Sequence, residues 1–296
     1  MALRLIPLLA VFVVAACGTT VPSASSGGHK VQVVAAENFW GSIAAQVGGE
    51  HANVTSIIAN PNTDPHDYEA TPSDARLVAT ADFVIANGVG YDPWVQKLVD
   101  ANPVTGRKLL VVGDQMGKTE GDNPHLWYSP DYVRRLVDII GADLGSLDPA
   151  DADYFTQQAL YFKGVSLMSY NNEISIIRDH FVGTKVGASE SIFSYLADAL
   201  NLDLVTPYSY LKAVSEGAEP SAADRAEVER EITSTEIRVF VFNSQNSTPD
   251  VQGLVAKART AGIPVVAITE TLSPQGATFQ QWQGRQLNDL LRALGG

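Results

Sequence analysis

The chain has 296 residues, of which 45% are hydrophobic and 18% are charged, a balance typical of a globular protein rather than a disordered one. Its 33 acidic residues outnumber the 20 basic ones, which gives a formal charge of −13. Because binding of nucleic acid needs a basic surface, this charge argues against DNA or RNA as a partner. The length is sufficient for one large domain or two smaller ones.

The first residues have the pattern of an export signal. An apolar run over residues 5–16 follows a single arginine, and the run is too short for a relaxed membrane span of about 20 residues. The sequence Val-Ala-Ala-Cys at 14–17 matches the lipobox of bacterial lipoproteins, although an ordinary signal peptide with a chance cysteine is the alternative. We therefore expect a signal peptide over residues 1–16, lipidation at Cys17, and a Gly/Ser-rich tether over residues 17–30. Cys17 is the only cysteine, which excludes an intramolecular disulfide.

Beyond the tether, short apolar runs alternate with amphipathic stretches. Continuous apolar strands alternating with helices predict parallel sheets covered on both faces. The runs that we expect to form strands are 31–36, 54–59, 83–88 and 109–113, and then 185–189, 202–207, 237–243 and 265–269. The stretches that we expect to form helices are 38–48, 72–81, 92–101 and 129–146, and then 190–200, 220–235, 249–261 and 278–293.

A long helical stretch separates the two halves. Asp148 suits the N-cap position and Pro149 the first helical position, and apart from Gly164 no strong helix breaker follows until Gly183. A helix of about 30 residues extends roughly 45 Å, which is long enough to join two lobes. We therefore expect an α/β fold of two lobes, each with a four-stranded, mostly parallel sheet. The expected segments are an N-terminal lobe at 31–147, a linking helix at 148–180 and a C-terminal lobe at 181–296.

Four side chains of metal-binding type follow predicted strands. His66 and His125 follow strands of the first half, and Glu190 and Glu270 follow strands of the second. The plainer interpretation is that the histidines are ordinary loop residues and that the glutamates favour helix N-termini. However, ligands of open α/β sheets bind beyond the carboxyl ends of the strands. The equivalent positions of these four residues therefore favour one metal site in a cleft between the lobes.

Asn243 and Gln245 follow another apolar strand of the second half. They are candidates for supporting the ligands from behind, although an Asx turn is the plainer interpretation. A site with two imidazole and two carboxylate donors is suited to manganese or zinc. We favour manganese slightly over zinc, and iron less.

Four motifs carry a resemblance to a known family. They are "DPHDYEATPSD" (64–74), "NPHLWYSP" (123–130), "SESIFSYLADAL" (189–200) and "TETLSP" (269–274). In order and spacing they resemble the zinc/manganese family of ABC-transporter solute-binding lipoproteins, known as cluster A-I, from about Val31 to the C-terminus. The resemblance implies two (β/α) lobes bridged by one long helix, with metal ligands at His66, His125, Glu190 and Glu270.

Two departures from the family pattern argue against a strict preference for zinc. Members that favour zinc commonly have a third histidine where this chain has Glu190. Many also carry a His-rich loop before the Pro-His-Leu-Trp motif, whereas the loop here is "GDQMGKTEGDN" (113–123), without a histidine.

The resemblance and the candidate site together imply a transport function. We expect a monomer, anchored by lipid to the outer face of the cytoplasmic membrane, that captures one divalent metal ion and delivers it to an ABC-transporter permease. A metal-dependent hydrolase is an alternative, but it needs an open coordination position and a general base, as in a His-Glu-x-x-His helix, and the sequence contains no such motif. A surface adhesion or interaction lipoprotein is a third possibility. We expect no enzymatic activity.

Overall fold

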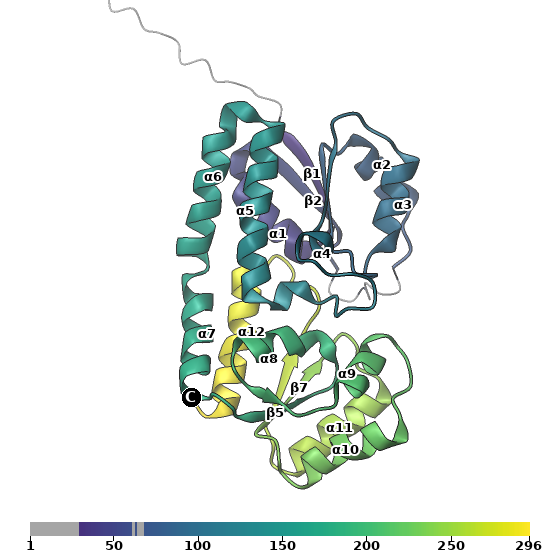
Figure 1. Ribbon diagram of the computed structural model, residues 1–296, viewed down its shortest axis with the longest axis vertical. Helices are drawn as coiled ribbons and strands as arrows, with labels where there is room; N and C mark the ends of the chain where they lie inside the picture. The colour runs from purple at the N-terminus through teal and green to yellow at the C-terminus, as the bar shows by residue number, and fades with distance from the viewer. Residues whose placement is uncertain (1–29, 61–62, 64–67) are drawn as a thin grey trace, which may run out of the picture.

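The computed structural model describes residues 30–60, 63 and 68–296. The predicted signal peptide, Cys17 and His66 lie outside these residues. The described chain forms two lobes that lie one above the other and are joined along one side by helices (Figure 1).

The N-terminal lobe is built on a parallel sheet with the strand order β2-β1-β3-β4. Its strands are β1 (Val31–Glu37), β2 (Ala52–Ile58), β3 (Phe83–Ala86) and β4 (Lys108–Val111). Its helices are α1 (Asn38–Gly48), α2 (Pro72–Thr80), α3 (Pro93–Ala101), α4 (Val112–Gln115) and α5 (Pro130–Leu147), with 3-10 turns η1 (Gly49–His51) and η2 (Leu126–Tyr128). Three of these helices begin at a proline, which has no backbone N–H to leave unpaired at the first position of a helix.

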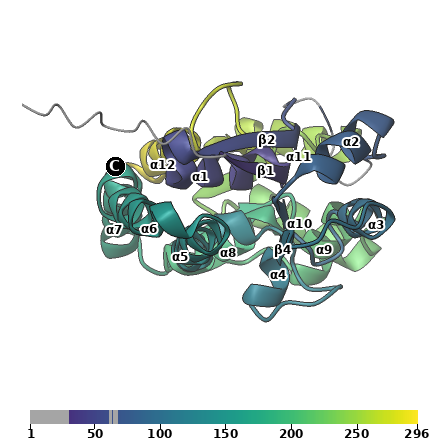
Figure 2. The same ribbon diagram turned by 90° about the horizontal axis from the view of Figure 1, so that it is seen from above.

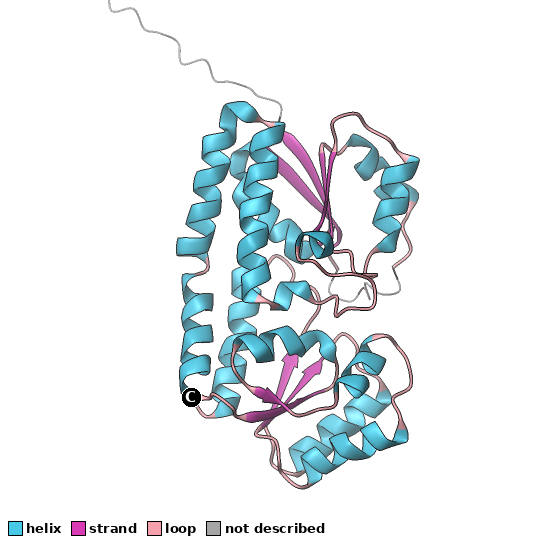
Figure 3. Cartoon of the chain, in the orientation of Figure 1, coloured by secondary structure: helices cyan, strands magenta, loops and turns pink. Residues whose placement is uncertain are grey.

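The C-terminal lobe repeats this plan with the strand order β6-β5-β7-β8, again with parallel pairing throughout. Its strands are β5 (Lys185–Ala188), β6 (Asp203–Leu204), β7 (Val239–Asn243) and β8 (Val265–Ile268). Its helices are η5 (Ser191–Phe193), α8 (Ser194–Ala199), α9 (Tyr208–Ser215), α10 (Ala222–Thr233), α11 (Pro249–Thr260) and α12 (Phe279–Leu294). The two predicted parallel sheets are therefore confirmed (Figure 3).

The linking segment differs from the single long helix that the sequence predicts. It consists of η3 (Pro149–Asp151), α6 (Ala152–Tyr161), a π-helical turn η4 (Phe162–Ser166) and α7 (Met168–His180). The amide of Leu167 donates to the carbonyl of Phe162 at 2.9 Å, which skips one residue more than an α-helix does. The segment is helical, as predicted, but it is interrupted at the turn that contains Gly164 (Figure 1).

Further differences concern short elements, among them α4, which begins inside the predicted strand at 109–113. The predicted strand at 202–207 shrinks to the two residues of β6, and α9 follows it where no helix was predicted. An eight-residue helix has only about two turns, so its apolar repeat is too short to stand out in a sequence.

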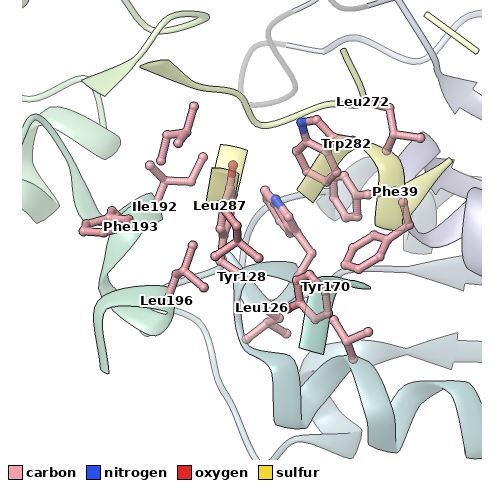
Figure 4. Packing of buried hydrophobic residues seen from close by; sticks show 14 of the residues in the cluster. Phe39, Leu126, Tyr128, Tyr170, Ile192, Phe193, Leu196, Leu272, Trp282 and Leu287 are labelled. Carbon is pink, nitrogen blue, oxygen red and sulfur yellow. The ribbon is translucent and has the colours of Figure 1, made fainter. Parts of the chain in front are cut away.

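One hydrophobic core runs through both lobes. In Figure 4, Leu126 and Tyr128 of the N-terminal lobe lie beside Ile192 and Leu196 of the C-terminal lobe, and all four are at most 1% exposed. The ring of Tyr128 also packs edge-on against Trp282 of α12, with 5.9 Å between ring centroids. The two lobes therefore pack against each other through a shared core.

The arrangement of the helices completes the joint between the lobes. Figure 2 shows the linking helices α6 and α7 beside α5, at one side of the sheets. Within the described residues, no helix has both the length and the apolar character needed to cross a membrane.

Candidate metal centre

Three of the four predicted ligands meet between the lobes. His125 immediately precedes η2, Glu190 lies between β5 and η5, and Glu270 lies two residues after β8. One ligand atom from each residue lies within 4.8 Å of the others, and none of the three side chains is more than 2% exposed. His66, the fourth predicted ligand, lies outside the described residues. The positions of the three residues after their strands follow the rule for open α/β sheets.

Neutral donors hold the two carboxylates in place. The amide nitrogen of Asn243 donates to Oε1 of Glu190 at 2.6 Å and to Oε1 of Glu270 at 2.7 Å. Asn246 donates to Oε2 of Glu190, and the hydroxyl of Tyr91 donates to Oε2 of Glu270, both at 2.7 Å. Two buried carboxylates this close together repel each other, and a divalent cation between them offsets both charges.

The imidazole of His125 is oriented through Nδ1. This atom lies 2.7 Å from Oδ1 of Asn123, an acceptor that also takes the backbone N–H of His125 at 3.1 Å. With the proton on Nδ1 donated to Asn123, Nε2 carries the lone pair that a metal ion requires. Asn123 in turn donates to the carbonyl of Ser191 at 2.8 Å, so the same side chain connects the two lobes.

Gln245 fixes the backbone that carries Glu270. Its Oε1 accepts from the amides of Glu270 and Thr271 at 2.6 and 2.9 Å, and its Nε2 donates to the Thr271 hydroxyl at 2.7 Å. The backbone amide of Gln245 donates to Oδ1 of Asn243 at 2.9 Å. This contact forms the Asx turn that was the alternative interpretation of the sequence. Asn243 therefore forms the turn and also contacts both carboxylates.

A buried carboxyl pair supports the loop that follows β3. Asp92 accepts the backbone amides of Asn87 and Gly88 at 2.6 and 2.7 Å. Burial raises the pKa of Asp92 to about 6, and burial together with the neighbouring Asp92 raises the pKa of Glu37 well above its ordinary value. A proton on Glu37 therefore allows the pair to be buried with a single charge. The pair positions the loop from which Tyr91 reaches Glu270.

Tyr91, Asn123 and Asn246 were not predicted as site residues from the sequence. Hydroxyl and amide side chains are common in loops, and only their contacts with the carboxylates and the imidazole distinguish them here. The one available signal is position, because Tyr91 follows β3 in the same way that the predicted ligands follow other strands.

A second group of possible donors lies apart from this site. His51, Asp148 and Asp151 converge, but all three are only half-buried. Nδ1 of His51 lies 2.6 Å from Oδ2 of Asp151, and the centroids of the His51 and Tyr154 rings are 4.4 Å apart. These contacts tie η1 to η3 and α6, and we interpret them as structural.

The sequence matches, over residues 33–293, the family described as zinc-uptake complex component A, periplasmic. The chain belongs to this family. The resemblance noted from the four motifs is thereby confirmed, and neither a hydrolase nor an adhesin is supported.

Relatives in this family include proteins named for manganese and for zinc. The chain is 27% identical over 199 residues to the manganese-binding lipoprotein MntA of Halalkalibacterium halodurans, with 65% of each chain covered. It is 24% identical over 291 residues to the metal ABC transporter substrate-binding lipoprotein ScbA of Streptococcus cristatus, with 92% of this chain and 91% of the relative covered. It is 26% identical over 263 residues to the zinc-binding lipoprotein AdcA of Streptococcus pneumoniae, with 79% of this chain and 50% of the relative covered.

Solved structures confirm the family fold. The manganese-bound periplasmic metal binding protein from Candidatus Liberibacter asiaticus superposes with a TM-score of 0.75 at 21% identity, covering 90% of this chain and all of that one. The SBP FpvC from Pseudomonas aeruginosa in complex with Mn²⁺ superposes with a TM-score of 0.72 at 18% identity, covering 90% of this chain and 98% of that one.

Proposed function

We propose that this protein captures one divalent transition-metal ion outside the cytoplasm and delivers it to an ABC-transporter permease. One observation supports the proposal most strongly. The buried side chains of His125, Glu190 and Glu270, which come from both lobes, bring their ligand atoms close together. We further propose His66 as the fourth ligand on the basis of its place in the sequence after β2. A ligand set made up by the protein itself favours holding an ion over activating a water molecule, which needs an open coordination position. The proposed function is therefore metal binding without catalysis.

Manganese is the proposed ion, with zinc as its main competitor. Carboxylate oxygens suit harder ions such as manganese, whereas imidazole suits zinc. Two carboxylates are held ready by neutral donors in this site, and the relatives include proteins named for each metal.

The proposed location is the outer face of the cytoplasmic membrane, with a lipid on Cys17 as the anchor and the protein as a monomer. Cys17→Ser is expected to release the protein from the membrane fraction or to leave its signal uncleaved. Unchanged fractionation together with an unchanged mass would contradict the lipid anchor.

Metal analysis tests the proposed function directly. The protein without its first 17 residues is stripped with chelator, exposed to equimolar manganese, zinc and iron, and analysed by mass spectrometry of the bound metal. We expect one ion per chain, mostly manganese, and loss of that ion in Glu190→Ala. His66→Ala tests the fourth ligand in the same assay. If the stripped protein takes up none of the three metals, the proposed function is wrong.

A further inference from the structure

A cavity of about 260 Å³ lies between the lobes beside the candidate metal centre. It is lined by the loops at 89–91 and 120–124 of the N-terminal lobe and by η5 and α9 of the C-terminal lobe. Because both lobes contribute walls, any movement of one lobe against the other changes its width.

The inner wall of the cavity reaches the candidate ligands. Tyr91, Asn123 and Ser191 line it, and all three are at least nine-tenths buried. Tyr91 donates to Glu270 at 2.7 Å and Asn123 lies 2.7 Å from the His125 ring. Ser191 is the residue after Glu190. Each of the three candidate ligands is therefore joined to a residue of the cavity wall, two by a hydrogen bond and Glu190 by a peptide bond.

The mouth of the cavity is acidic and is crossed by one lysine. The lining residues Glu120, Asp122 and Glu216 are exposed. Lys212 of α9 donates from Nζ to the carbonyl of Gly121 at 2.9 Å, and the same Nζ lies 3.6 Å from Glu216. The first of these contacts joins the two lobes, whereas the second joins α9 to the residue that directly follows it.

We propose that this cavity is the path by which the metal ion reaches and leaves the candidate metal centre, and that Lys212 closes it. The proposal rests on the proposed function. Carboxylates at a mouth raise the local concentration of cations. The ammonium group of Lys212 opposes that attraction, and its bond to Gly121 has to break before the lobes separate on this side.

An ordinary role for Lys212 is an ion pair along one face of α9, since Glu216 is four residues further on. Exposed pairs of this kind contribute only a few tenths of a kcal/mol, and such a pair does not require the contact with Gly121 in the other lobe. Replacing Lys212 leaves two further contacts between the lobes nearby, from Tyr195 to the carbonyl of Asn123 and from Asn123 to the carbonyl of Ser191. The fold is therefore expected to survive the change.

The test is the rate at which bound Mn²⁺ passes to excess EDTA, measured by stopped-flow. Lys212→Met keeps the apolar stem but loses the donor and the charge, and we expect release about three- to ten-fold faster, the factor that one lost hydrogen bond gives. Lys212→Arg keeps both properties and is expected to behave like the unchanged protein. Lys257→Met is the matched control, because Lys257 is also a partly exposed lysine of this lobe but pairs with Glu229 on α10.

Lys212→Trp tests whether the cavity is the route of the ion, independently of whether the hydrogen bond of Lys212 closes it. It also loses the hydrogen bond, but its ring fills the mouth, so metal uptake and release are both expected to be slower than in Lys212→Met. If Lys212→Trp releases the ion as fast as Lys212→Met, the ion uses another route. If Lys212→Met and Lys257→Met release the ion at the same rate, Lys212 does not close the cavity. Either result overturns the proposal while one ion per chain still binds, whereas failure of the proposed function is seen as no binding in any variant.

Discussion

Asn243 bridges two carboxylates with the two hydrogens of a single amide group. An aspartate here replaces both donors with a third buried negative charge. We expect Asn243→Asp to lower the stability of the metal-free protein by about 3 kcal/mol, since a hydrogen bond to a charged group contributes roughly 1.5–3 kcal/mol. Added Mn²⁺ is expected to restore more stability to this variant than to the unchanged protein.

Calorimetric melting in chelator, and then in excess Mn²⁺, measures both effects of Asn243→Asp. Asn172→Asp on the exposed face of α7 is the control for the change of charge. Equal melting temperatures for the two variants in chelator would show that the bridging amide does not stabilise the pair of carboxylates.

Glu270 has the least distinctive sequence motif of the predicted ligands, and its loss is the most informative single change. Glu270→Ala removes one anionic donor and, with it, the carboxylate that accepts from Tyr91 and from Asn243. We expect Mn²⁺ affinity to fall by more than about 100-fold, because changes to groups that only support ligands already cost 10–100-fold. Glu270→Asp keeps the charge and is expected to be milder.

Isothermal titration compares Glu270→Ala with Glu219→Ala. The side chain of Glu219 is 83% exposed and pairs with Arg225 of α10. Matching affinities for the two alanine variants would remove Glu270 from the site.

Groups whose chemistry is distinctive could be predicted from the sequence. Imidazole and carboxylate side chains placed after strands were sufficient to select His125, Glu190 and Glu270. The support from Tyr91 and Asn246 was not predictable, because it depends on distances across the interface between lobes and on the loop after β7.

At the scale of elements, Glu231 connects α10 to the sheet of the C-terminal lobe. It is fully buried, and its Oε2 accepts from the hydroxyl of Thr206, which itself accepts the amide of Ala188 in β5 at 3.1 Å. Burial raises the pKa of Glu231 from 4.5 to about 7. Between these two pH values the unfolded chain has released the proton and the folded chain still holds it. The contribution of Glu231 to stability therefore falls as the pH rises from about 4.5 to about 7.

Glu231→Gln keeps an acceptor for Thr206 but cannot ionise. We expect its stability to change less between pH 5 and pH 8 than that of the unchanged protein, with a difference of roughly 1–3 kcal/mol. Urea unfolding at the two pH values measures this difference. Glu229→Gln on the exposed side of α10 is the control. Parallel pH dependence in all three proteins would show that Glu231 does not titrate in this range.

Elements with a strong periodic pattern were predictable and short ones were not. The helix expected at 38–48 and the strands at 31–36 and 265–269 lie within about one residue of α1, β1 and β8. The sequence pattern did not reveal α9 or the π-helical turn, because the first is short and the second changes the spacing by a single residue.

A metal ion bound between the lobes is expected to stabilise both of them. An ion present at about 100 times its dissociation constant adds roughly 2.7 kcal/mol. Chelation is expected to lower the melting temperature, and manganese to restore it. Glu190→Ala should lose most of this response while keeping the fold. A melting temperature that is indifferent to chelator and to each metal would contradict a site between the lobes.

The relative position of the lobes was the least predictable feature of the fold. Repeated strand–helix units predict two parallel sheets from local patterns. The joint between them depends on contacts such as those of Tyr128 with the carbonyl of Thr269 at 2.8 Å and with the Trp282 ring. These residues are 141 and 154 positions apart from Tyr128 in the sequence, and no periodicity records their pairing.

The buried residues of the linking segment follow a repeat with one irregular step. Their successive spacings are four, three, five, three, four and three, from the sequence Phe155, Ala159, Phe162, Leu167, Tyr170, Ile174 and Ile177. The step of five falls at the π-helical turn. Gly164 in that turn is exposed, with no atom near its missing side chain. Deleting Gly164 is expected to leave a foldable protein, and deleting Gln157 of α6 is expected to destabilise it strongly, as thermal melting followed by circular dichroism can show.

In genetic terms, we expect the linking segment to contain one codon that the fold can do without. Losing it turns the step of five into a step of four, and the segment becomes a continuous α-helix with the same buried side. Losing a codon elsewhere in α6 or α7 rotates the side chains that follow it in the same helix by about 100° and brings polar residues against the core. We therefore expect a related chain with one residue fewer at this turn to need no compensating change elsewhere.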